Sequence, residues 1–118
     1  MWTLQSVEPA EVALTFRLLP GTLKTLGRAP RADFVVDAAL VSRVHCRFVL
    51  NDVNELELED LGSTNGTFLR RSRVRTEVAL DDGDEIKVGT VVLTIRLWAS
   101  DKAPHTKRIR KRNKGPGS

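Results

Sequence analysis

Three short stretches of the sequence carry the side chains that are best suited to chemistry. One ends at an arginine that follows a glycine, the second reads Ser-Arg-Val-His from position 42, and the third reads Ser-Thr-Asn from position 63. Guanidinium groups supply planar, charged donors that match phosphate oxygens, and hydroxyl groups complete the coordination of such an anion. If loops bring these stretches together, the site suits a phosphorylated side chain better than a neutral ligand. The candidate binding residues are Arg28, Ser42, Arg43, Ser63, Thr64 and Asn65.

Catalysis is a weaker interpretation of the same residues. Ser42 and His45 resemble a nucleophile and a base, but residues three apart in an extended segment point to opposite faces, and no acid is spaced to orient the histidine. The sequence shows no P-loop, and one cysteine with two histidines does not form a zinc pattern. The acidic stretch 81–84 lacks the spaced ligands of a calcium loop and predicts a turn. We therefore expect no enzyme, no metal and no cofactor.

The elements that must position these residues are short strands. No segment of ten or more residues has the apolar spacing of an amphipathic helix, whereas about ten short runs of strand-forming residues are each bounded by turn residues. This pattern predicts an all-β protein, an antiparallel β-sandwich with no substantial helix and with loops gathered at its two ends. The expected strands span residues 12–18, 22–26, 34–36, 45–50, 55–60, 67–69, 75–80, 85–88 and 91–98.

Two of these strands lie next to the polar stretches in the sequence. Residues 55–60 alternate strictly, and Asn65-Gly66 is a strong signal for a tight turn, so the chain is expected to reverse there. That loop is either a β-hairpin turn whose polar groups cap their own backbone or a loop that presents them to a ligand. In the strand from position 45, Cys46, Phe48 and Leu50 fall on one face, which predicts that they belong to the core.

Composition places the chain in the class of single folded domains with a charged tail. It has 118 residues, of which 41% are hydrophobic, and it contains neither an apolar run near 18 residues nor a secretory signal. Seven of its 19 basic residues but one of its 15 acidic residues fall after position 100, so the tail carries +6 and the rest −2. We expect a domain over 1–99 and a basic, disordered tail over 100–118, in an intracellular protein without membrane contact.

The tail supports three interpretations. A dense basic run is typical of a nuclear localisation signal or of a nucleic-acid contact through phosphate neutralisation. It is equally typical of a solvated linker to a further region. The basic residues concerned are Lys107, Arg108, Arg110, Lys111 and Arg112.

The combined motifs resemble the signature of the forkhead-associated (FHA) domain. The matching residues, in order, are Gly27-Arg28, Ser42-Arg43-Val44-His45 and Gly62-Ser63-Thr64-Asn65-Gly66-Thr67. The resemblance covers about residues 2 to 98. It implies the FHA/SMAD-like β-sandwich of about eleven strands, which binds phosphothreonine peptides through loops at one end.

The resemblance also implies roles for individual residues. Arg28 and Ser42 would hold the phosphate, Arg43 would add charge, Thr64 would donate a hydroxyl, and Asn65 would hydrogen-bond the peptide backbone. Three positions would support the site without touching the ligand, and these are Gly27, His45 and Gly66. Three others would set the sequence preference: Leu40, with an apolar preference at the third residue after the phosphothreonine, and Arg70 and Arg71, with a preference for acidic flanks.

The expected function follows from this resemblance. The chain would be a non-enzymatic module that recognises a phosphothreonine-containing protein, within a nuclear protein of signalling or of the DNA-damage response. Two alternatives remain open: a homodimer formed through the sheet faces, and a nucleic-acid contact made by the tail.

Overall fold

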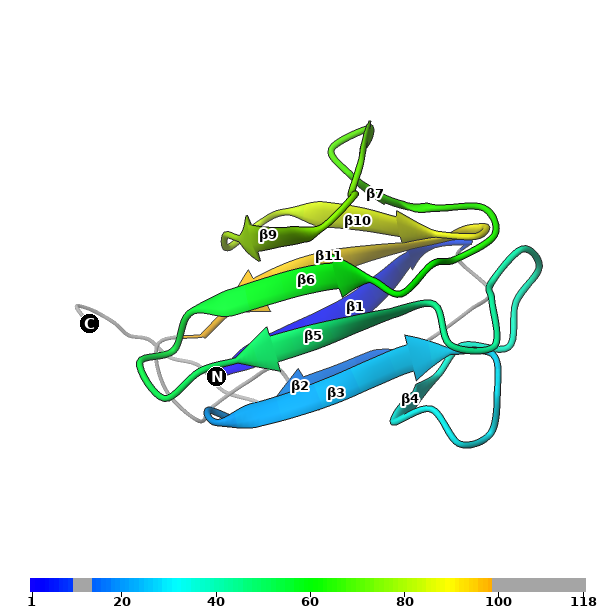
Figure 1. Ribbon diagram of the computed structural model, residues 1–118. Coiled ribbons are helices and arrows are strands. Elements are labelled where there is room, and N and C mark those ends of the chain that lie inside the picture. The colour runs from blue at the N-terminus through cyan, green and yellow to red at the C-terminus, as the bar shows by residue number, and fades with distance from the viewer. Residues whose placement is uncertain (10–13, 99–118) are drawn as a thin grey trace.

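A computed structural model describes residues 1–9 and 14–98, which form eleven strands in two facing sheets (Figure 1). The described residues contain no helix, so none that could cross a membrane. The predicted all-β sandwich is confirmed. The six-stranded sheet has the order β2 (Thr15–Leu18), β1 (Trp2–Glu8), β11 (Val91–Leu97), β10 (Glu85–Val88), β7 (Thr67–Leu69) and β8 (Ser72–Arg73). The five-stranded sheet has the order β4 (Phe34–Val35), β3 (Thr22–Gly27), β5 (Cys46–Leu50), β6 (Leu56–Asp60) and β9 (Glu77–Leu80).

The core lies between the inner faces of the two sheets. Cys46, Phe48 and Leu50 of β5 point inward, as their alternation predicts, and Phe48 is fully buried. Burying a side chain of this size stabilises a fold by about 1.5–3 kcal/mol. Burial also raises the pKa of the Cys46 thiol, so this cysteine stays neutral and packs as an apolar group.

All neighbouring strands but one pair run antiparallel. The exception is β4, whose Phe34 lies parallel to Leu26 of β3. Asp33, just before β4, accepts hydrogen bonds from the backbone amide of Thr25 (2.8 Å) and from its hydroxyl (3.1 Å), and these bonds hold the short strand against β3. The pKa of Asp33 is lowered chiefly by that backbone hydrogen bond.

Residues 61–66 do not form the β-hairpin turn that the sequence allowed. β6 pairs with β5 and β9 in one sheet, whereas β7 pairs with β10 and β8 in the other. The loop therefore carries the chain across the sandwich. The prediction of a hairpin was wrong because the Asn-Gly signal specifies a local backbone turn and not which strand pairs with which.

The first strand was not predicted. Residues 2–8 mix polar and apolar side chains without a clean period, yet β1 lies between β2 and β11, and its Leu4 is fully buried. The strand expected from position 12 begins at Thr15 in the structure, and residues 10–13 lie outside the described part.

The basic connection expected after β7 is instead a two-residue hairpin. Leu69 pairs with Ser72, and the intervening Arg70 and Arg71 have φ angles of 48° and 73°. Positive φ at both central residues defines a type I′ turn, which normally selects Asn and Gly. Two arginines in this turn are therefore strained.

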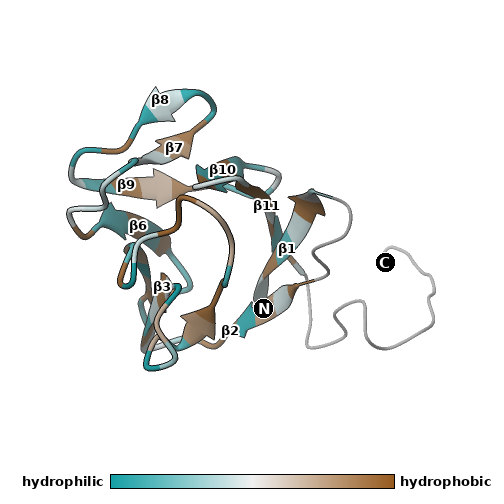
Figure 2. Ribbon diagram, turned by 90° about the vertical axis from the view of Figure 1, so that its right-hand side faces the viewer, coloured by the Kyte–Doolittle hydropathy of each residue, from teal (hydrophilic) through white to brown (hydrophobic). Residues whose placement is uncertain are grey.

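The loops that hold the candidate residues gather at one end of the sandwich. They are the segment after β3, the connection from β4 to β5, the β6–β7 crossover and the β10–β11 turn, at the right-hand end of Figure 1. Figure 2 views this end, with β3 and β6 on one side and β1 and β11 on the other.

The strain at the β7–β8 turn predicts that Arg71→Gly stabilises the protein. Glycine adopts positive φ without a Cβ clash, and the gain is partly offset by its larger unfolded-state entropy, so we expect about 0.5–1 kcal/mol of added stability. Urea unfolding measures the change. Ser72→Gly, one position later in β8, is the matched control and should be neutral or destabilising; a destabilised Arg71→Gly would contradict the strain.

Candidate functional site

The end of β3 and the β4–β5 connection are joined backbone to backbone. The Arg28 amide donates to the carbonyl of Ser42 (2.9 Å), and the Ala29 amide donates to that of Arg43 (3.1 Å). A Cβ on Gly27 would lie 2.1 Å from the Arg43 carbonyl oxygen, so only glycine permits this approach. Gly27 thus lets the end of β3 lie against the β4–β5 connection.

His45 joins this pair of segments to the β6–β7 crossover. The Ser42 amide donates to Nδ1 of the ring (3.0 Å), and Nε2 lies 3.0 Å from the carbonyl oxygen of Gly66. A backbone amide can only donate and a carbonyl can only accept, so the ring is neutral and carries its proton on Nε2. His45 has no exposed surface. It connects the two loops from within the protein.

Asp60, the last residue of β6, organises the crossover. Its carboxylate accepts from the amides of Gly62 (3.0 Å) and Ser63 (3.1 Å) and from the hydroxyls of Ser63 (2.6 Å) and Thr67 (2.7 Å). Partial burial raises the pKa of Asp60, but the hydrogen bonds from Ser63, Thr67 and Gly62 outweigh it, so the pKa is lowered overall.

Ser63 consequently belongs to the support of the loop. It is only 6% exposed, and its hydroxyl donates to Asp60 while accepting from the Gly66 amide (3.0 Å). The prediction that Ser63 contacts a ligand conflicts with this position, because both the donor and an acceptor site of its hydroxyl are used inside the loop.

The two residues after Ser63 point outward and are tied to the opposite loop. The Thr64 amide donates to Oγ of Ser42 (3.0 Å), and the side-chain amide of Asn65 donates to the carbonyl of Leu40 (3.2 Å). Ser42 thus keeps its hydroxyl proton for an external acceptor, and Asn65 keeps its carbonyl oxygen and one N–H for an external partner.

These contacts enclose a cleft at the loop end of the sandwich. Nε of Arg28 donates to the carbonyl of Val41 (3.1 Å), which fixes the guanidinium while its terminal N–H groups have no other partner among the described residues. Arg43 likewise has no side-chain partner in that part of the chain. One carboxylate, Asp37, also lines the cleft, so the site has a net charge of +1. The predicted residues that line it are Arg28, Leu40, Ser42, Arg43, Thr64 and Asn65.

The remaining predicted residues lie elsewhere. Arg70 and Arg71 line a neighbouring groove, and Arg70 forms an ion pair with the buried carboxylate of Asp84. Gly66 has φ +90° in the crossover. The basic residues of the tail lie outside the described part of the chain. Within residues 1–9 and 14–98, no group of three or more His, Cys, Asp or Glu side chains is placed to hold a metal ion.

Asp60 was the main residue that the sequence analysis missed. Its signal was present, since an aspartate at the start of a Gly-Ser-Thr loop often accepts hydrogen bonds from the backbone two and three residues on. Gly89 was missed as well: a Cβ there would lie 2.6 Å from the carbonyl oxygen of Ala39, so the β10–β11 turn supports the β4–β5 connection closely.

Comparison with known families identifies the class of domain. Residues 24–89 match the family model of the FHA domain, and this span holds every residue of the cleft. The chain belongs to the FHA domain family.

Bacterial regulators are among the relatives of this FHA domain. Over 72 residues it is 42% identical to the oxoglutarate dehydrogenase inhibitor of Corynebacterium efficiens and 40% identical to the glycogen accumulation regulator GarA of Mycobacterium tuberculosis. Each alignment covers 61% of this chain, and 49% and 43% of those proteins respectively. The chain thus spans about half the length of the curated relatives it matches.

The fold resembles that of solved FHA domains. One of them, from a structural and functional analysis of phosphothreonine-dependent FHA domain interactions, has a TM-score of 0.74 and 31% identity. The match covers 84% of this chain and 98% of that domain.

The relatives contradict the predicted cellular location of this FHA domain. Corynebacterium and Mycobacterium are bacteria and have no nucleus, so the prediction of a nuclear protein with a nuclear localisation signal was wrong. A role in the DNA-damage response is not supported either, since those relatives are named for metabolic regulation. A basic run has the same charge in any cell, and its composition does not specify the compartment.

The bridging geometry predicts the tautomer of His45. Long-range ¹H–¹⁵N NMR spectra should show a protonated Nε2 and an unprotonated Nδ1, because Ser42 donates to one nitrogen and Gly66 accepts from the other. His105, outside the FHA domain match, provides a reference signal in the same spectrum. A proton on Nδ1 of His45 would contradict the geometry.

The hydrogen bonds at Asp60 predict that Asp60→Asn destabilises the domain by about 1.5–3 kcal/mol, the range for hydrogen bonds to a charged group. Asp52→Asn, an exposed carboxylate in the turn before β6, is the matched control and should change stability little.

The pH dependence of that effect has a defined sign. The folded-state pKa of Asp60 lies below its ordinary value of 3.8, so the stabilisation is complete above that pH and is lost as pH falls through the folded-state pKa. Urea unfolding between pH 2 and 6 should show the wild type and Asp60→Asn converging at low pH. A constant difference across this range would contradict the role of the carboxylate.

Proposed function

We propose that this FHA domain recognises a phosphothreonine in a partner protein through the cleft at its loop end. The observation that supports the proposal is the free donor set of that cleft. Within the described residues, the terminal N–H groups of Arg28 and the guanidinium of Arg43 have no partner, and Ser42 and Thr64 offer hydroxyls, all on loops fixed by hydrogen bonds to one another.

The roles within the site follow from these contacts. Arg28, held at Nε by Val41, directs its terminal N–H groups to the phosphate together with the hydroxyl of Ser42. Arg43 adds charge, and Thr64 adds a hydroxyl donor. Asn65, held by Leu40, bonds the peptide backbone beside the phosphothreonine. Ser63 is not included, because its hydroxyl is used within the crossover.

Electrostatics makes binding at this site depend on phosphorylation of the partner. A phosphate adds about −1.5 to −2 charges and three acceptor oxygens to the partner, which charge-assisted hydrogen bonds from arginine recognise. Without the phosphate, the guanidinium groups have no counter-charge from the ligand, and the Asp37 carboxylate repels other acidic groups. Binding therefore depends on the phosphate.

The domain organisation extends this proposal. We place the FHA domain in residues 1–99 and a basic tail in residues 100–118, within a bacterial regulatory protein. Because the chain spans about half of its curated relatives, the target and the regulated process belong to the whole protein.

The proposal predicts micromolar binding of phosphothreonine peptides that is strongly weakened in Arg28→Ala. Removing one charge-assisted contact of about 1.5–3 kcal/mol should weaken binding roughly 10- to 150-fold. Isothermal titration with a degenerate phosphothreonine library measures the affinity, with phosphoserine and unphosphorylated libraries for comparison.

Arg31→Ala is the matched control for this experiment. Arg31 is an exposed arginine in the next loop and does not line the cleft. It should bind like the wild type. Equal losses in Arg28→Ala and Arg31→Ala would indicate general charge attraction, and wild-type binding to the unphosphorylated library would contradict phosphate recognition.

A further inference from the structure

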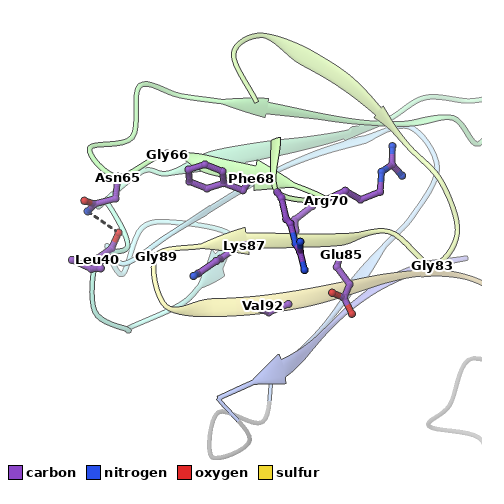
Figure 3. Close-up of a pocket in the computed structure, with 12 residues that line it drawn as sticks. Leu40, Asn65, Gly66, Phe68, Arg70, Gly83, Glu85, Lys87, Gly89 and Val92 are labelled. Atoms are coloured by element: carbon purple, nitrogen blue, oxygen red, sulfur yellow. Dashed lines mark hydrogen bonds between the residues drawn. The ribbon is translucent and has the colours of Figure 1, made fainter. Parts of the chain in front are cut away.

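A groove of about 790 Å³ adjoins the phosphate cleft and runs onto the outer face of the six-stranded sheet (Figure 3). Leu40 and Asn65 line both hollows, so the two are continuous. The phosphothreonine-binding proposal does not use the part of the groove that lies over β7, β10 and β11.

The floor of this groove is a row of side chains on three neighbouring strands. Phe68 of β7 pairs with Lys87 of β10, which in turn pairs with Val92 of β11, and all three point away from the core. Figure 3 shows the Phe68 ring near the Asn65 end, with Lys87 on the next strand and Val92 on the strand beyond it. Phe68 and Val92 are partly exposed and offer apolar contact on either side of the Lys87 ammonium group.

The charge of the groove is positive. Arg70, Arg71 and Lys87 line it, and among the described lining residues Glu85 is the one carboxylate. Arg70 is neutralised by its ion pair with Asp84. Arg71 and Lys87 have no hydrogen bond or ion pair within residues 1–9 and 14–98. A ligand with acidic groups beside an apolar side chain complements this surface.

Backbone strain is concentrated around the same groove. Of the four non-glycine residues with positive φ in the described chain, three line it: Leu40 (69°), Arg70 (48°) and Arg71 (73°). Leu40 is also 58% exposed, so neither backbone preference nor burial explains a leucine at this position. Strained, exposed residues gather at binding surfaces, where their side chains are needed in a fixed direction.

We infer that this groove binds a flanking segment of the phosphorylated partner in which acidic residues surround an apolar one. The inference rests on the proposed function, since the phosphothreonine in the adjoining cleft positions the segment. The apolar side chain packs against Phe68, and the acidic groups meet Lys87 and Arg71. The groove thus lets the domain distinguish among phosphothreonine proteins.

Two peptides test the inference on the full chain. The core peptide is a phosphothreonine with three neutral residues on each side. The extended peptide adds Glu-Leu-Glu-Glu, at either end in separate versions. We expect one extended version to bind the wild type about three- to ten-fold more tightly than the core peptide, since exposed charge pairs and a small apolar contact each add modestly. A Gly-Ser extension of equal length should give no gain.

The ratio of extended to core affinity is the readout for variants. Lys87→Glu and Arg71→Glu should reduce the ratio to about one, because each reverses a charge that meets the extension. Arg17→Glu is the matched control: it makes the same change at an exposed residue of β2, on the same face of the sheet but at its far edge, and should keep the wild-type ratio.

Each remaining outcome contradicts the groove or the proposed function. Core binding without a gain from either extension overturns the groove and leaves the proposed function intact. A gain that Arg17→Glu loses equally reflects general charge attraction. If Lys87→Glu instead weakens a concentration-dependent self-association in sedimentation, the groove binds a second copy of the chain. Failure of the core peptide to bind overturns the proposed function and the groove with it.

Discussion

The binding end of this domain depends on one buried imidazole. His45 accepts from the Ser42 amide and donates to the Gly66 carbonyl, and so joins the connection from β4 to β5 to the β6–β7 crossover. The ring has no exposed surface and its bond to Gly66 is fully buried, so losing the ring would leave the buried Gly66 carbonyl without this partner. The ring therefore sets the positions of Ser42 and Thr64 relative to each other, because each residue belongs to one of the two joined loops.

Other contacts also hold the loops at this end of the sandwich close together. Glycine at position 27 lets the chain approach the Arg43 backbone, and glycine at position 89 lets the β10–β11 turn approach Ala39. Asp60 holds the crossover through four hydrogen bonds. A site whose loops are ordered before the ligand arrives loses little conformational entropy on binding, so a few charge-assisted hydrogen bonds give useful affinity.

The surroundings of the cleft suggest how a common binding reaction becomes selective. Phosphate contacts are the same for every phosphothreonine, whereas the adjoining groove combines positive charge with the apolar surface of Phe68 and Val92. The strain at Leu40, Arg70 and Arg71 indicates that the direction of these side chains matters more than local backbone preference. Selectivity would then come from the sheet face and the phosphate requirement from the loops.

The sequence by itself determined the fold class, the inward face of β5 and most of the candidate residues of the cleft, because these depend on local period and on residue type. Alternation with a period of two places Cys46, Phe48 and Leu50 inward, whatever the partner strands are. Only the tertiary structure decided which polar groups are available to a ligand. Ser63 and Thr64 are neighbours with similar hydroxyls, but Asp60 takes up the first, and the amide of the second reaches Ser42, 22 positions away in the chain. Strand pairing between sheets, the crossover at residues 61–66 and the groove over β7, β10 and β11 likewise rest on contacts between distant residues, which no local pattern specifies.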